Sequence, residues 1–92
     1  MTEFKYKPSF ESRFKKHYKK MIKGGRYQKI DFEIVYRKLL SDAPLDDHYN
    51  DYPLKNRRPE RDLHIKPDWL LIYKYDGEYV KFIDTGTHSD LF

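Results

Sequence analysis

The sequence contains no cysteine. This absence excludes disulfide bonds and thiolate catalysis, and it removes the commonest ligands of structural zinc sites. Four histidines remain, but no two of them stand four residues apart on an expected helix. We therefore expect neither a metal site nor another cofactor, and the histidines point instead to proton transfer.

Long apolar runs are also missing. The longest, from Trp69 to Tyr73, covers about five residues, whereas a membrane-spanning helix needs roughly 20. The first residues, Met-Thr-Glu-Phe-Lys-Tyr, lack the apolar stretch of a secretory signal peptide. We therefore expect a cytoplasmic protein without membrane association. Its 92 residues leave room for one domain, which we place at residues 1–92.

Positive charge and aromatic side chains are abundant. The formal net charge is +4, the isoelectric point is about 9.2, and 17% of the residues are aromatic. A basic chain favours a polyanionic partner, because each neutralised phosphate releases condensed counterions. Aromatic rings can stack on the unpaired bases of single-stranded RNA. Many small basic domains bind nothing anionic, however, so charge alone leaves nucleic-acid binding open.

The first half of the chain predicts a strand and two helices. Residues 4–8 alternate apolar and basic side chains, which is typical of a short edge strand that Pro8 would end. Ser9 is the expected cap of a first helix, which Gly24 and Gly25 would stop. A second, antiparallel helix is expected at residues 27–40. Its expected core positions are Ile30, Ile34, Val35 and Leu39.

The second half predicts a long loop followed by a small sheet. Residues 41–59 are rich in aspartate, asparagine and proline, and so long a loop in a small domain is usually functional. Strands are expected near residues 60–66, 69–75 and 79–84, with a hairpin turn at Asp76-Gly77. These elements predict an α+β domain. In it, an N-terminal edge strand and a two-helix hairpin pack on a mostly antiparallel sheet of three to four strands.

Candidate catalytic side chains gather around the ends of the last strands. His64 and Asp68 flank the corner between two of these strands, and His88 follows the last one. Two histidines and a carboxylate suit general acid–base chemistry. Structural alternatives are a buried His64, a solvent-exposed His88 and an Asp68 that caps the turn. Trp69 is as typical of a core as of an RNA platform, and Phe92 fits either core docking or base stacking.

These motifs resemble YafQ-like toxins of the RelE/ParE superfamily of toxin–antitoxin systems. The resemblance covers roughly residues 44–92, while the helices agree only in pattern. It implies a RelE/ParE-like fold and a toxin that inhibits translation by cutting mRNA in the ribosomal A site. The implied chemistry is attack by a 2′-hydroxyl group, which needs a base, an acid and charge stabilisation but no metal. Its most distinctive segments are residues 51–54, 61–64, 67–73 and 85–92.

The resemblance also assigns roles to individual residues. His64, Asp68 and His88 match catalytic positions of the family, with the choice of base and acid left open. Phe92 matches an aromatic residue that positions RNA, and Trp69 matches the tryptophan or apolar position beside the aspartate. Both are therefore candidates for stacking on bases.

Two positions depart from the family pattern. Tyr52 stands where many relatives have histidine, and a tyrosine can still donate a hydrogen bond or move a proton; His48 is a nearby alternative. Asp84 stands at or next to an arginine that holds the phosphate in relatives, and a carboxylate there would repel the phosphate. The expected substitutes for that arginine are Arg61 and, failing that, Arg57 or Arg58.

The remaining expectations concern partners. The first helix has a basic side that is either simply solvated or, as we favour, bound to the 16S rRNA backbone, and its key residues are Lys15, Lys16, Lys19 and Lys20. The resemblance implies two further partners: the ribosome with its mRNA, and a cognate antitoxin that covers the site or wraps the helices. Operator DNA would be bound only through that antitoxin.

Two rival functions stay open. In the first, Tyr52 and Asp84 mark a catalytically degenerate toxin that serves as antitoxin partner and transcriptional co-repressor. In the second, the same fold carries a ParE-like inhibitor of DNA gyrase, since a fold does not fix a function.

Overall fold

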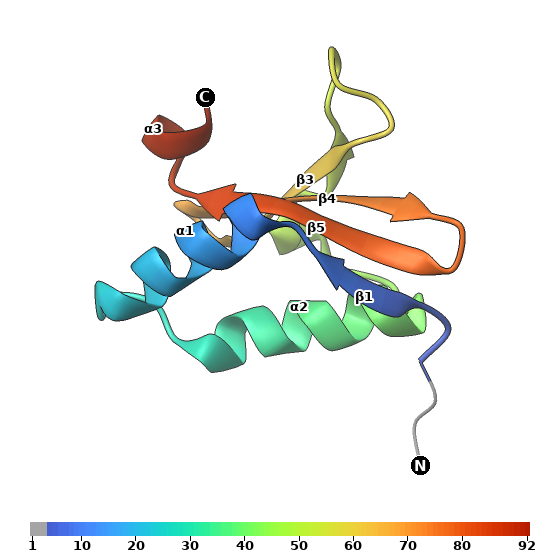
Figure 1. Cartoon of the computed structure of the whole chain (residues 1–92), viewed down its shortest axis with the longest axis horizontal. Coiled ribbons are helices and arrows are strands. Elements are labelled where there is room, and N and C mark those ends of the chain that lie inside the picture. Colours follow the sequence, from blue (N-terminus) through green and yellow to red (C-terminus); the bar gives the residue numbers. More distant parts are fainter. Residues whose placement is uncertain (1–3) are drawn as a thin grey trace.

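A computed structural model describes residues 4–92 and shows one mixed sheet with two long helices on one of its faces (Figure 1). Residues 1–3, which belong to the segment searched for a signal peptide, lie outside it. No helix within the described chain is long and apolar enough to cross a membrane. The elements in chain order are β1 (Lys7–Phe10), α1 (Ser12–Lys23), α2 (Lys29–Ser41), the 3-10 turn η1 (Asp47–Tyr49), β2 (Tyr52–Pro53), β3 (Arg61–Lys66), β4 (Trp69–Asp76), β5 (Tyr79–Gly86) and α3 (His88–Leu91).

The sheet has the strand order β1-β5-β4-β3-β2. β1 runs parallel to β5, and the other neighbouring pairs are antiparallel. The α+β class and the mostly antiparallel sheet are thus confirmed, as is the hairpin turn, where Gly77 has φ +58°. Within residues 4–92 the sheet has five strands rather than three to four, because the two-residue strand β2 forms inside the predicted loop.

The N-terminal strand lies later in the chain than predicted. β1 contains Pro8, which an edge strand tolerates because one side of its backbone needs no partner. The following helix begins at Ser12, so Glu11 and not Ser9 occupies the N-cap position, and the Glu11 side chain makes no capping hydrogen bond. Phe10 therefore belongs to the strand, where its ring stacks on Phe82 with centroids 5.0 Å apart.

The inward side of α2 was predicted only in part. Val35 and Leu39 are buried, but Ile30 and Ile34 are 52% and 43% exposed. Phe32 turns toward the sheet instead. Because α2 has apolar residues on more than one side, the sequence pattern alone did not identify its buried face.

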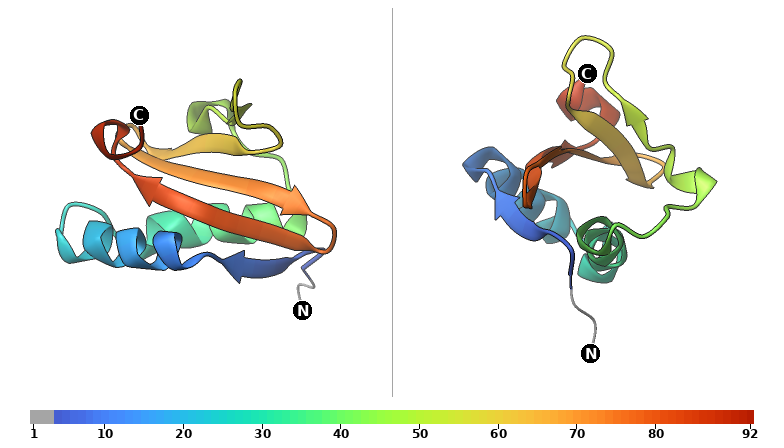
Figure 2. Two further views of the ribbon diagram at one scale, coloured as in Figure 1. Left: turned by 45° about the horizontal axis from the view of Figure 1, so that its top comes forward. Right: turned by 90° about the vertical axis from the view of Figure 1, so that its right-hand side faces the viewer.

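Alternation along the strands gives the sheet two unlike faces. The helix-covered face contributes Leu63, Leu71 and Phe82 to the core beneath α1 and α2. On the open face, Asp62 and His64 stand opposite Ile72 and Leu70 of β4. Two protrusions rise on this open side, namely α3 and the loop of residues 54–60 (Figures 1 and 2). The fold thus leaves a sheet surface between two arms, away from the helices.

Candidate active site

Three predicted residues meet at the open face. His64 lies on β3, Asp68 in the β3–β4 turn, and His88 at the start of α3. The Nε2 atoms of His64 and His88 are 3.3 Å apart, and Nδ1 of His88 is 2.7 Å from Oδ1 of Asp68. The backbone N–H of His88 donates to the same carboxylate oxygen at 3.0 Å. These contacts form a chain from carboxylate to imidazole to imidazole.

Local structure holds His88 in place. Thr87 and Asp90 form a capping box: the Thr87 side chain accepts from the Asp90 N–H, and the Asp90 carboxylate accepts from the Thr87 N–H. A Cβ atom on Gly86 would approach the Cβ atom of Asp90 to 2.9 Å. Glycine is therefore required there because the cap packs directly against the backbone.

The hydrogen bonds of Asp68 fix the tautomer of His88. The pKa of the Asp68 carboxyl lies below its usual value, mainly because the carboxylate accepts hydrogen bonds from the backbone N–H of His88 and, second, from the His88 ring N–H. An ionised carboxylate only accepts hydrogen bonds, so Nδ1 of His88 must carry a proton. Nε2 of His88 is then the atom that exchanges a proton with a neighbour.

His64 also has only one ring nitrogen that can exchange a proton. Its Nδ1 atom is buried, and within the described chain it has no hydrogen-bond partner. Its exchangeable contact is the Nε2 atom that faces His88. Chemically, the pair can shuttle a proton between two imidazoles, one of which is oriented by a carboxylate.

Asp62 is a functional candidate that sequence reasoning missed. It lies two residues before His64 and so faces the same side of the sheet, opposite Tyr52 in the β2–β3 pair. Burial raises the pKa of the Asp62 carboxyl. Tyr52 is 63% exposed on the same face. The alternation of Leu63 and Ile65 with polar residues was the signal that places Asp62 beside His64.

Arg61 corrects a prediction. Its Nε atom donates to Asp51 Oδ1 at 3.2 Å, and the Tyr73 hydroxyl donates to the same oxygen at 2.6 Å. As an alternate residue of β3, Arg61 shares the helix-covered face with Leu63 and points away from His64. It therefore does not hold a phosphate at the histidine pair.

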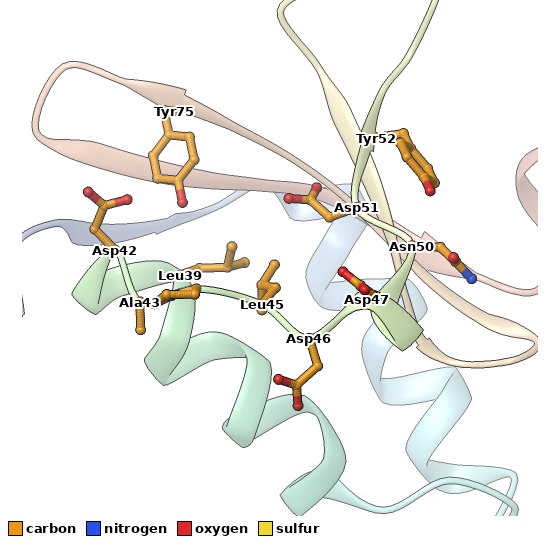
Figure 3. A pocket seen from close by; sticks show the side chains of 11 residues that line it. Leu39, Asp42, Ala43, Leu45, Asp46, Asp47, Asn50, Asp51, Tyr52 and Tyr75 are labelled. Atoms are coloured by element: carbon orange, nitrogen blue, oxygen red, sulfur yellow. The ribbon is translucent and has the colours of Figure 1, made fainter.

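The surroundings of Asp51 are acidic. Figure 3 shows the Asp51 and Tyr52 side chains pointing to opposite sides of the strand. Both residues line a hollow of about 730 Å³. Carboxylates repel phosphate, so this hollow is a poor path for RNA. The four aspartates that line it are Asp42, Asp46, Asp47 and Asp51.

Trp69 is a second correction. Its side chain is fully buried, and its indole N–H donates to Thr85 Oγ1 at 2.8 Å. Its ring packs against Tyr27, with centroids 5.1 Å apart. The core alternative therefore holds, and the prediction that Trp69 stacks on RNA bases is wrong because no ring face is exposed.

Asp84 is a structural carboxylate. Only 10% of its side chain is exposed, and Oδ1 accepts from His17 Nδ1 at 2.6 Å and from the Thr85 N–H at 2.8 Å. Arg13 Nε lies 3.5 Å from its other oxygen. The carboxylate faces α1 and is compensated there, so the expected repulsion of a scissile phosphate does not follow from its position.

Several predicted contacts lie on exposed segments. Arg57, paired with Glu60 at 2.7 Å, and Arg58 belong to the loop above the open face. Phe92 is 63% exposed and its N–H donates to the His88 carbonyl at 2.9 Å. The exposed lysines of α1 diverge, because Lys15 and Lys19 line a groove shared with α2, whereas Lys20 lines a small cavity with His17 and Asp90. Lys16 is also exposed.

Arg26 is a cation that the sequence did not single out. It lies in the turn between α1 and α2, 5.3 Å above the Tyr27 ring. The Tyr27 hydroxyl donates to the Asp68 carbonyl at 3.3 Å. The Arg26 charge also contributes to the lowered pKa of Asp68, after the hydrogen bonds from His88. This turn therefore places a positive charge near Asp68.

His48 and His64 line one cavity of about 540 Å³. The His48 ring lies 4.1 Å from that of Tyr49. Among residues 4–92, no three histidines or carboxylates are grouped so that they can hold a metal ion.

Known proteins resemble this chain in sequence and in fold. A family model described as "Bacterial toxin of type II toxin-antitoxin system, YafQ" matches residues 6–92. The mRNA interferase toxin YafQ of Escherichia coli is 46% identical over 50 residues, which are 53% of this chain and 54% of that protein. The aligned part thus spans about half the length of the curated relatives.

Solved structures match almost throughout. The Escherichia coli DinJ–YafQ complex contains a chain with a TM-score of 0.83 at 30% identity, with 95% of this chain and 98% of that chain covered. A metal-bound toxin from Helicobacter pylori gives a TM-score of 0.89 at 30% identity, with 95% and 99% covered. The chain therefore belongs to the YafQ family of bacterial toxins of type II toxin–antitoxin systems.

Proposed function

We propose that this chain is a ribosome-dependent endoribonuclease, the mRNA interferase of its toxin–antitoxin pair. The observation that carries the proposal is the chain of contacts from Asp68 through His88 to His64 on the open face. Acid and base groups stand together there, with two protruding arms beside them. The protein would act in the cytoplasm on mRNA in the ribosomal A site and so stop translation.

In the mechanism we propose, His88 is the base and His64 the acid. Asp68 holds the proton on Nδ1 of His88, so the lone pair on Nε2 takes the proton of the 2′-hydroxyl group. The 2′-oxygen attacks the adjacent phosphorus and forms a cyclic 2′,3′-phosphate while the bond to the 5′-oxygen breaks. His64 Nε2–H gives its proton to that leaving oxygen. RNA binding must part the two rings, which touch at 3.3 Å.

The phosphate charge needs a cation other than Arg61. Arg26 stands beside Asp68 through its packing on Tyr27. Arg58 is exposed on the 54–60 loop and makes no ion pair within residues 4–92. We assign charge stabilisation to these two arginines, with Arg57 as a further backbone contact.

The remaining site residues have supporting roles. Phe92, exposed beside His88, stacks on a base, and Tyr52 donates a hydrogen bond from the open face. The Lys16 and Lys20 side of α1 contacts the 16S rRNA backbone. The reaction needs only proton transfer and charge stabilisation, so it proceeds without a metal cofactor. The partner is an antitoxin, which alone binds operator DNA; the relative in the DinJ–YafQ complex supports such a pairing.

The first experiment is induced expression without antitoxin, for the native chain and His88→Ala. We expect growth arrest with A-site cleavage of a reporter mRNA by primer extension, and loss of both in the variant. Normal growth with intact mRNA, at confirmed protein levels, would exclude the enzyme. DNA damage without mRNA cleavage would favour the gyrase inhibitor.

A second experiment separates acid from base. An mRNA with sulfur in place of the 5′-oxygen has a leaving group that needs no acid. This substrate should restore cleavage by His64→Ala on the ribosome and should leave His88→Ala inactive. The reverse pattern would exchange the two roles.

The degenerate-toxin alternative is tested by Asp84→Arg. That alternative requires the substitution to create toxicity in an inert protein. We expect the opposite, since Asp84 joins β5 to Arg13 and His17 of α1. The variant should lose stability and gain no cleavage.

A further inference from the structure

A cavity at the end of β3 is unused by the proposed catalysis. It has a volume of about 540 Å³, and residues of β3, of the turn η1 and of the first half of α2 line it. β2 pairs with Arg61 and Asp62, and within residues 4–92 no strand flanks the rest of β3 on this side. The cavity lies beside this free part of β3, and His64 is one of the residues that line it.

The walls of the cavity suit a flat, aromatic occupant. Ile34 of α2 and Pro67 of the β3–β4 turn both line it, and both are exposed. The His48 ring is exposed as well and rests on the Tyr49 ring, with centroids 4.1 Å apart. A nucleobase has two flat faces that stack on rings and pack against apolar side chains. These walls can therefore cover the faces of one base.

The polar groups of the cavity include one ion pair. Asp31 Oδ1 lies 3.4 Å from Lys66 Nζ, and both residues line the cavity. Their side chains are 22% and 48% exposed, so an occupant can reach both. The pair presents a carboxylate with two accepting oxygens beside an ammonium group that only donates. A base bound here needs an acceptor next to its donors, so that neither charge loses its partner.

Guanine fits this pair better than the other RNA bases. Its O6 can accept from Lys66, while the neighbouring N1–H and N2–H donate to the two oxygens of Asp31. Guanine alone carries one acceptor and two adjacent donors on a single edge, which gives three hydrogen bonds. Adenine, cytosine and uracil can each satisfy the same pair with two. The chemistry of the ion pair thus selects one base.

The charge balance of the cavity also permits RNA to approach. Among the described residues that line it, Asp31 alone has a carboxylate, and Lys66 neutralises it. The hollow beside Asp51 differs, because four aspartates line it. Phosphate would be repelled from that hollow but not from the cavity.

We propose that this cavity binds the guanine base of the nucleotide that follows the cut; the position of that nucleotide rests on the proposed function. In the proposed mechanism, His64 protonates the 5′-oxygen of this nucleotide, which therefore lies beside His64. His64 also lines the cavity, so the base of the same nucleotide is brought to its entrance. Asp31 and Lys66 determine the sequence preference without touching the reacting atoms.

The test is cleavage on ribosomes programmed with four mRNAs that differ only in the base after the cut. We expect the native chain to cleave the guanine mRNA about tenfold faster than the others. Asp31→Asn replaces one accepting oxygen by an amide N–H group that cannot accept from guanine. In this variant the ratio of rates should fall to about threefold or less, whatever the overall rate.

The matched control is Asp46→Asn. It weakens another ion pair of α2, in which Asp46 Oδ2 lies 3.9 Å from Lys38 Nζ, and neither residue lines the cavity. The control should keep the native preference for guanine. Urea unfolding of both variants checks that the protein remains folded. A ratio of rates on two mRNAs also cancels any loss of active protein, so a merely structural role of Asp31 would not change it.

Equal rates on all four mRNAs, a preference for another base, or an unchanged preference in Asp31→Asn would each overturn the proposal. If the native chain cleaves no mRNA, the proposed function fails, and a second measurement decides the cavity. This is a nuclear magnetic resonance titration of the isotope-labelled chain with 5′-GMP and, in parallel, with 5′-AMP. We expect 5′-GMP to shift the amide signals of Asp31, Ile34 and Lys66 at lower concentration than 5′-AMP, and Asp31→Asn to remove this difference. Equal responses to the two nucleotides in the native chain would overturn the proposal.

Discussion

The two faces of the sheet use similar groups in opposite ways. On the helix-covered face, Asp51 accepts from Arg61 and Tyr73. On the open face, Asp68 accepts both the backbone and the ring N–H of His88. Each carboxylate gathers two donors on one oxygen. The difference lies in access, because 24% of the Asp51 side chain is exposed but 42% of that of Asp68.

Access decides what each arrangement can do. Burial raises the pKa of the Tyr73 hydroxyl, so it stays protonated and remains a hydrogen-bond donor to Asp51. The His88 ring is exposed and touches a second imidazole, so its proton can move to another group. The first arrangement stabilises the fold, and the second is available for chemistry. Substitutions should separate these two outcomes.

The largest expected effect is that of His88→Ala. Removing a general base lowers the rate of mRNA cleavage by about 10²–10⁴-fold. The ring is exposed, so the free energy of unfolding should change by no more than about 0.5 kcal/mol. Cleavage is measured on programmed ribosomes and stability by urea unfolding, with Ser89→Ala as control. If a fall in the free energy of unfolding accounted for the lost cleavage, His88 would stabilise the fold and not act as the base.

The next prediction compares substitutions of the two carboxylates, Asp51 and Asp68, for their effects on stability and on cleavage. Asp51→Ala leaves a partly buried guanidinium and a buried hydroxyl without their acceptor, which should lower the free energy of unfolding by about 1–3 kcal/mol. Cleavage per folded molecule should stay within about twofold of native. Asp68→Ala should do the reverse, lowering cleavage about tenfold or more, because the His88 tautomer is no longer fixed.

Urea unfolding and cleavage on the ribosome, measured for both variants, test this comparison. If Asp51→Ala slows cleavage by folded protein as much as Asp68→Ala does, the two faces are not functionally separate. Asp51→Asn serves as a milder control, since its amide oxygen can still accept both hydrogen bonds but carries no charge.

The sequence was sufficient to predict the meeting of His64, Asp68 and His88. Two of them flank a short turn and the third follows the neighbouring strand, so antiparallel pairing brings them together. It was also sufficient to place Arg61, because Leu63 and Ile65 alternate with polar residues and fix which face is buried. The search for a substitute for the arginine that relatives have at or next to position 84 outweighed that alternation and led to the wrong role for Arg61.

Other features depend on contacts far apart in the chain. Asp84 and His17 are 67 residues apart, and only the position of α1 along β5 makes them partners. Trp69 begins a strand, where either face was possible, and its burial follows from its packing on Tyr27 and its bond to Thr85. Local patterns carry no information on such tertiary neighbours.

A moderate effect is expected from Gly86→Ala. The added Cβ would meet that of Asp90 at 2.9 Å and disturb the capping box that places His88. Loss of such a cap costs about 1 kcal/mol, and we expect cleavage to fall about fivefold. The matched control is Gly77→Ala, where φ is +58° but, apart from the two neighbouring residues, no atom of residues 4–92 lies within 4 Å of the new Cβ. It should lose stability but keep its cleavage rate; equal loss of cleavage in both would mean that the cap does not position His88.

The smallest expected effect is on the pH dependence of stability, which should differ in sign between Asp62 and Asp68 on the open face. Burial raises the pKa of Asp62 above its ordinary 3.8, so the folded state binds the proton more tightly than the unfolded state. Its contribution to the free energy of unfolding therefore falls as pH rises from 3.8 through the folded pKa. Asp68 has a lowered pKa, so its contribution is present above 3.8 and is lost as pH falls through the folded value.

Urea unfolding between about pH 3 and 7 on Asp62→Asn and Asp68→Asn measures both signs. At neutral pH, Asp62→Asn should be slightly more stable than the native chain and Asp68→Asn slightly less, and both differences should shrink in acid. Solvent screening keeps both changes small. If both variants shifted stability in the same direction, burial would not make the Asp62 carboxylate costly to the fold. Asp62 would then lack the electrostatic cost that distinguishes a candidate catalytic group from a stabilising one.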